Sequence, residues 1–66
     1  MRVWINGDPH DVPEPATVAD ALAAMGAPAA GVAVAVDGEV VPRAGWSERR
    51  LAAEARIEVL TAVQGG

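Results

Sequence analysis

The end of the chain, Gln64-Gly65-Gly66, is the segment whose residue types and spacing suggest chemistry. Glycine has no Cβ and adopts backbone conformations that other residues avoid. A diglycine end therefore presents its carboxylate on a slim, flexible chain that can thread a narrow tunnel into the active site of another protein. A frayed terminus without a function is the competing interpretation, because chain ends are often poorly ordered.

Residues for other kinds of chemistry are scarce. The chain has no cysteine, so it lacks a thiolate nucleophile, a disulfide framework and a cysteine-based metal site. His10 is the only histidine, and one histidine is too few for a metal site. A chain of 66 residues also rarely encloses a deep pocket, since a domain of this size buries only about 60% of its unfolded surface. We therefore expect a carrier, adaptor or binding module with no catalytic residue, metal or cofactor of its own.

The composition excludes several partners. The net charge is −4 and the chain contains no lysine, so a basic stripe for nucleic acid is missing. The first residues turn polar too soon for a signal peptide. The longest apolar stretch, Ala27 to Val36, is shorter than the roughly 20 residues that span a bilayer. We expect a soluble, cytoplasmic protein with no nucleic-acid or membrane partner.

The first half of the chain predicts a hairpin followed by a helix. Met1, Val3 and Ile5 alternate with Arg2 and Trp4, as in a half-buried strand, and Asn6-Gly7 is typical of a two-residue turn. A short edge strand over residues 10–12 should follow, limited by three prolines. The helix should run from Thr17 to about Met25, with a capping box completed by Asp20. Gly26 should end it in the left-handed conformation.

The second half predicts another hairpin and a final strand. Residues 31–36 and 39–41 flank Asp37-Gly38, a second two-residue turn. Residues 42–55 read as irregular, with a helical turn over 47–51, and the last strand should cover 57–63. This order predicts an α+β fold of the β-grasp, ubiquitin-like type, with a mixed sheet of about four to five strands wrapped on one helix. A ferredoxin-like alternative would need a second long helix, which residues 42–55 are too weakly patterned to supply.

The same patterns predict the core and the domain limits. The domain should span residues 1–63, followed by a flexible tail over 64–66. The expected core residues alternate along the strands or share one face of the helix: Val3, Ile5, Val18, Leu22, Met25, Val34, Val36, Ile57 and Val59. We assign Trp46 to structure, as a plug under the long loop. Arg43 either anchors that loop or contacts a partner.

Three segments resemble one known family. They are Thr17 to Leu22 at the start of the helix, Val41-Pro42-Arg43 followed by Trp46, and Ala62 to Gly66. Together with the β-grasp order, they resemble the thiamin-biosynthesis sulfur carrier family (ThiS) over essentially the whole chain. The chain departs from the family pattern before the last strand. Many members carry a Gly-Asp turn there, whereas this chain has Glu54-Ala55-Arg56, and its turn should therefore have a different geometry. Carriers for molybdopterin, cysteine or thiosugar synthesis share the fold and the diglycine and remain alternatives.

The resemblance implies that partners carry out every chemical step. An adenylating enzyme resembling the ubiquitin-activating enzyme would use ATP and Mg²⁺ to join AMP to the Gly66 carboxylate. Sulfur that comes ultimately from a cysteine desulfurase would convert the adenylate to a thiocarboxylate, and thiazole synthase would accept that sulfur. Gln64 and Gly65 would deliver Gly66 to these sites. A ubiquitin-like protein modifier and an adaptor with an unused tail are the competing functions.

Strand alternation predicts where a partner binds. The residues expected to point away from the helix are Trp4, Val40, Leu60 and Ala62, near the charged residues Arg2, Glu39 and Glu58. An exposed apolar patch with a charged rim is typical of a protein interface, so we expect this face to bind the adenylating partner. Alternatively, Trp4 folds onto its own strand neighbours, since single apolar residues are common on surfaces.

Overall fold

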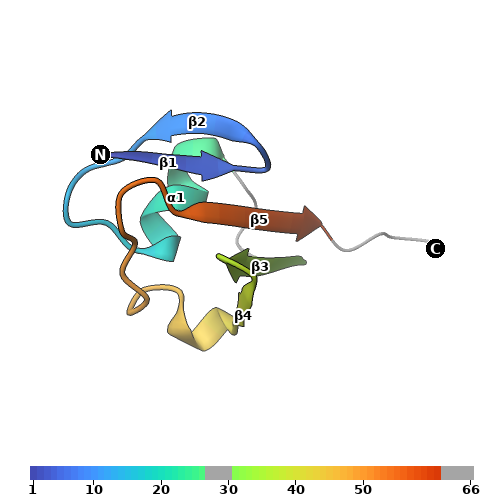
Figure 1. Ribbon diagram of the computed structural model, residues 1–66. Coiled ribbons are helices and arrows are strands. Elements are labelled where there is room, and N and C mark those ends of the chain that lie inside the picture. Colours follow the sequence, from blue (N-terminus) through green and yellow to red (C-terminus); the bar gives the residue numbers. More distant parts are fainter. Residues whose placement is uncertain (27–30, 62–66) are drawn as a thin grey trace.

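The computed structural model of the protein describes residues 1–26 and 31–61. The elements are, in chain order, β1 (Arg2–Ile5), β2 (Asp8–Asp11), α1 (Val18–Met25), β3 (Val32–Val36), β4 (Glu39–Val41), a 3₁₀ turn η1 (Arg43–Gly45) and β5 (Arg56–Thr61). The five strands form one sheet in the order β2-β1-β5-β3-β4. β1 and β5 are parallel and the other neighbours are antiparallel. One helix lies across one face of this mixed sheet (Figure 1), which confirms the predicted β-grasp fold.

Both predicted hairpin turns are present. Asn6 and Gly7 have φ of 53° and 86°, and Asp37 and Gly38 have φ of 50° and 85°. Positive φ at both central residues defines the type I′ turn, whose twist matches that of the flanking strands.

The predicted position of the second strand, residues 10–12, is wrong. Because the turn is only two residues long, pairing resumes at once, with Ile5 opposite Asp8. Pro9 consequently lies inside β2, opposite Trp4. β2 is an edge strand, where the missing N–H of a proline is tolerated.

The helix has the expected caps. The Thr17 N–H donates to Asp20 Oδ2 at 2.8 Å and the Asp20 N–H to Thr17 Oγ1 at 3.4 Å, which completes the capping box. Gly26 has φ of 74°, and its N–H turns back to carbonyls of the last helical turn. The two ends therefore fix the helix length by local hydrogen bonding.

The segment between β4 and β5 differs from the prediction in one detail. Its helical turn is η1 at Arg43–Gly45 rather than residues 47–51, because Pro42, at φ −60°, leads directly into it. Further on, the Leu51 N–H donates to the Ala16 carbonyl at 2.9 Å. The segment is thereby held against the chain that enters α1. β5 begins at Arg56, one residue earlier than expected, and residues 62–63 of the predicted strand lie outside the described residues.

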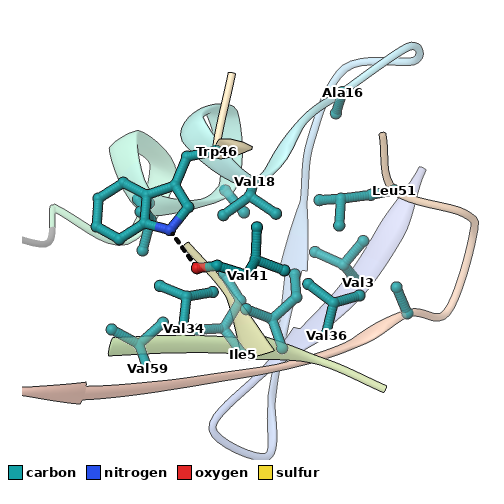
Figure 2. Packing of buried hydrophobic residues seen from close by; sticks show 14 of the residues in the cluster. Val3, Ile5, Ala16, Val18, Val34, Val36, Val41, Trp46, Leu51 and Val59 are labelled. Carbon is teal, nitrogen blue, oxygen red and sulfur yellow. Dashed lines mark hydrogen bonds between the residues drawn. The ribbon is translucent and has the colours of Figure 1, made fainter. Parts of the chain in front are cut away.

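The core lies between the helix and the sheet (Figure 2). Eight of the nine predicted core residues are buried, whereas Met25, in the last helical turn, is only half-buried. Trp46 is buried, as predicted for a plug under the loop, and its Nε1 donates to the Val41 carbonyl at 2.9 Å. Ala21, on the apolar face of the helix, is also buried. The buried residues that the strand and helix patterns did not predict lie in connections or at a strand end: Val12, Ala16, Val41, Leu51 and Ala55.

Candidate functional site

The predicted reactive end lies outside the described residues. This applies to Gly66, to the delivery residues Gln64 and Gly65, and to Ala62 of the predicted docking face. The structure instead shows the strand from which the tail departs. β5 is the central strand and pairs with β1 on one side and β3 on the other. β1 is paired with the first part of β5, whereas β3 is paired with β5 up to Thr61, the last described residue (Figure 1).

An apolar patch lies on the face of the sheet opposite the helix. Val40 and Leu60 are 72% and 68% exposed, respectively. Ala33 is paired with Leu60, and Ala35 with both Val40 and Glu58, so the register brings these side chains to one place. They border a shallow hollow of about 70 Å³. We call the four residues Ala33, Ala35, Val40 and Leu60 the outer apolar patch.

Trp4 lies on the same face but not in the outer apolar patch. It is opposite Arg56, which precedes Leu60 by four positions on β5, a separation of about 13 Å along a strand. Its Nε1 donates to Glu54 Oε1 at 2.7 Å, and the Arg2 guanidinium carbon lies 5.6 Å from the ring centroid. Val40 and Leu60 therefore come together, whereas Trp4 belongs to a separate cluster with Arg2 and Glu54.

The charged rim also differs from the prediction. Glu39 pairs with Val36 in the sheet, and Val36 faces the core. Glu39 consequently points to the helix side, where its Oε1 accepts a hydrogen bond from Arg49 Nη1 at 3.0 Å. Of the three predicted rim residues, all in the described part of the chain, Glu58 alone borders the outer apolar patch. The Arg43 side chain is exposed and makes no hydrogen bond or ion pair with another described residue, so both of its predicted roles stay open.

Glu54 has a structural role that the sequence patterns did not assign. Its φ of 67° lies in the left-handed region that favours glycine. Its N–H donates to the Arg2 carbonyl at 2.7 Å, and its carboxylate lies 3.6 Å from Arg2 Nε in addition to accepting the Trp4 bond. The departure from the family turn thus coincides with a contact between this turn and β1.

Two further residues were predicted only as turn formers. The Asn6 side chain bonds both backbone polar groups of Val59, and the Asp37 carboxylate accepts a bond from the Arg56 N–H. Both fasten a hairpin turn to β5. The sequence shows that an Asn or Asp occupies the first central position of each type I′ turn. It does not show which backbone groups these side chains contact, because that depends on the strand order.

The described residues do not form a metal site or a membrane-spanning helix. Within residues 1–26 and 31–61, His, Asp and Glu never gather in a group of three that could bind a metal ion. No helix in that part of the chain has the length and hydropathy needed to cross a membrane.

The family of this chain follows from a match over almost its whole length. A model of the ThiS family matches residues 3–66. The chain belongs to the ThiS family. This membership supports a sulfur-carrier role, in which a small protein that is not itself a catalyst works with partner enzymes of thiamin synthesis.

Two solved structures are similar to this ThiS-family chain. The crystal structure of the thiamine biosynthesis protein (ThiS) from Geobacter metallireducens is 29% identical, with all of both chains covered and a TM-score of 0.81. The NMR structure of a thiamine biosynthesis protein from the same organism is 30% identical, with a TM-score of 0.77. That alignment covers 100% of this chain and 88% of the other. Comparison with curated proteins gives no match.

Proposed function

We propose that this protein is the sulfur carrier for the thiazole ring of thiamin. A partner resembling the ubiquitin-activating enzyme joins AMP from ATP, with Mg²⁺, to the Gly66 carboxylate. The adenylate becomes a thiocarboxylate, which donates its sulfur to thiazole synthase. The observation that supports this proposal most directly is the family match over residues 3–66, which includes the diglycine.

The chemistry explains why the carboxylate must be activated. A free carboxylate is a poor electrophile, because its charge is delocalised and oxide would have to leave. In the mixed anhydride, AMP is the leaving group instead. The terminal sulfur of a persulfide, supplied through a cysteine desulfurase, attacks the carbonyl, forms a C–S bond and releases AMP. A thiol then cleaves the S–S bond of the resulting acyl persulfide, which leaves the thiocarboxylate on Gly66 and a disulfide between the thiol and the persulfide-bearing cysteine. Because ATP drives the first step, we place this function in the cytoplasm.

We also propose that the outer apolar patch binds the adenylating partner. Val40 and Leu60 are the exposed large hydrophobic residues of the described chain, and they lie together on one face. Ala62, two residues after Leu60, remains a proposed member of the same surface. Trp4 contacts the partner only if the interface extends across Arg56 to the cluster of Trp4, Arg2 and Glu54. Gln64 and Gly65 then deliver Gly66 to the nucleotide.

An intact-mass measurement tests the function. The protein is isolated from its host with the thiazole pathway induced, and the expected species has one carboxylate oxygen replaced by sulfur. Loss of that species on deletion of the host's thiazole synthase would contradict a role upstream of that enzyme, since blocked transfer should make the thiocarboxylate accumulate. A ladder of conjugates to other proteins would instead support a modifier. Full thiamin-independent growth with a chain lacking Gly65 and Gly66 would support an adaptor.

A further inference from the structure

The edge of β5 that faces β1 is covered over only part of its length. Trp4 N–H donates to the Ala55 carbonyl at 2.8 Å, and Asn6 N–H donates to the Ile57 carbonyl at 2.9 Å. Beyond Asn6 the chain turns into the first hairpin and leaves the sheet edge. The next polar backbone groups on this edge of β5 belong to Val59, and no residue of β1 is left to pair with them.

The Asn6 side chain takes the place of the missing strand residue. Its Oδ1 accepts the Val59 N–H at 2.9 Å, and its Nδ2 donates to the Val59 carbonyl at 3.1 Å. One primary amide therefore makes the two hydrogen bonds that a neighbouring strand would make. Val59 is followed only by Leu60 and Thr61 before the described part of the chain ends. On this edge of β5, within the described chain, the Asn6 amide is the last hydrogen-bonding contact before residue 62.

The second hairpin provides a natural comparison. Asp37 occupies the corresponding turn position, with φ of 50° against 53° for Asn6. Its N–H donates to the Arg56 carbonyl at 2.7 Å, and its Oδ1 accepts the Arg56 N–H at 3.0 Å. Two hairpin turns therefore fasten β5 through similar contacts, Asp37 at the start of the strand and Asn6 near its end. Only the Asn6 contact lies next to the tail.

We propose that Asn6 is a positioning residue for the predicted tail: by holding Val59 on the edge of β5 that faces β1, it steadies the end of this strand, whose other edge is paired with β3 up to Thr61. This inference rests on the proposed function, because it concerns delivery of the Gly66 carboxylate to the nucleotide. Movement of Val59 would widen the range of positions that the Gly66 carboxylate has to search before it reaches the nucleotide. A displacement of about 1 Å at a reacting centre is enough to cost roughly 100-fold in rate.

The test compares Asn6→Gly with Asp37→Gly. Glycine tolerates positive φ, so each variant keeps its turn and loses only the side-chain contact to β5. In Asn6→Gly we expect hydrogen exchange at the Val59 amide to rise about tenfold, as for the loss of hydrogen bonds of ordinary strength. In ATP–pyrophosphate exchange with the adenylating enzyme, kcat should fall at least about fivefold. The KM for the carrier should stay within about twofold, because the outer apolar patch is intact.

Asp37→Gly should leave both kcat and Val59 exchange near the wild-type values. If it lowers kcat as much as Asn6→Gly does at the same folded fraction, Asn6 has a structural role only and the proposal is overturned. The same conclusion follows if Asn6→Gly keeps the wild-type kcat despite faster Val59 exchange. Asn6→Asp keeps the Oδ1 acceptor and loses the donor, so its kcat is expected to lie between those of the wild type and Asn6→Gly. If Asn6→Gly does not fold, Asn6→Asp takes its place in the comparison. Absence of adenylation in the wild type would refute the proposed function itself, whereas the exchange measurement tests the Asn6 contact independently.

Discussion

The indole Nε1 of Trp46 donates to the Val41 carbonyl oxygen at 2.9 Å, inside the core (Figure 2). Val41 ends the edge strand β4, and Trp46 follows η1 in the long connection to β5. This bond therefore fastens the least regular part of the chain to the sheet.

Trp46→Phe should lower the free energy of unfolding by about 1–3 kcal/mol, because it removes the hydrogen bond to the Val41 carbonyl and part of a buried side chain. Urea unfolding followed by circular dichroism measures this difference. Trp4→Phe is the matched control, since the Trp4 Nε1 bonds to the exposed side chain of Glu54 and water can replace it. The Trp4 variant should lose clearly less stability. Equal losses would show that the Trp46 bond contributes nothing specific.

Leu22→Ala should lower the free energy of unfolding by about 2–5 kcal/mol, as for other buried leucines. Leu22 is only 6% exposed and faces the sheet from α1. Since small domains have roughly 5 kcal/mol of stability or little more, this variant is expected to be partly or wholly unfolded. Thermal melting checks the result, with the exposed Leu60→Ala as control. An unchanged melting temperature for Leu22→Ala would remove the helix from the core.

Local chemistry explains which parts of the fold could be predicted from sequence. The type I′ turns at Asn6-Gly7 and Asp37-Gly38 and the capping box of Thr17 and Asp20 depend on residues close together in the chain. The patterns that specify them are therefore complete in the sequence. Strand alternation likewise separated buried from exposed positions correctly, as Leu60 on β5 shows.

The candidate site was harder to predict, because it depends on register between distant strands. The alternation of residues along each strand placed Trp4 and Leu60 on the same face of the sheet. It could not show how far apart they lie on that face. Trp4 is opposite Arg56 only because β1 and β5 pair in parallel at that register. For the same reason, the sequence pattern could not reveal that the side chain of Asn6 reaches Val59.

Leu60→Asp should abolish adenylation while leaving circular dichroism and the melting temperature nearly unchanged. Leu60 is 68% exposed, so a charge there should cost little stability. It would nevertheless place a desolvated carboxylate in the interface formed by the outer apolar patch. Val40→Asp should behave in the same way, and Ser47→Asp, which puts the same charge on an exposed turn outside this patch, should remain active. Unfolding of Leu60→Asp would mean that the strand faces are inverted, and normal adenylation would move the docking surface elsewhere.

The diglycine should be essential for function but not for folding. Gly65→Val, or one residue appended after Gly66, should fold normally but fail in ATP–pyrophosphate exchange and never acquire sulfur. The carboxylate has to reach the α-phosphate of ATP inside the partner, and a Cβ at this point widens the chain and restricts its backbone. Because the tail follows the last strand, the free energy of unfolding should change by no more than about 0.5 kcal/mol.

Melting curves of the two tail variants provide the control for folding, and intact mass with the exchange assay provides the functional measurement. We expect both variants to have the wild-type melting temperature but to form neither the adenylate nor the thiocarboxylate. The decisive comparison uses the appended chain with protease absent, so that the extra residue cannot be trimmed. If that chain is still adenylated or thiocarboxylated, Gly66 is not the group on which the partner acts. The carrier function proposed for this protein would then fail together with the assignment of its tail.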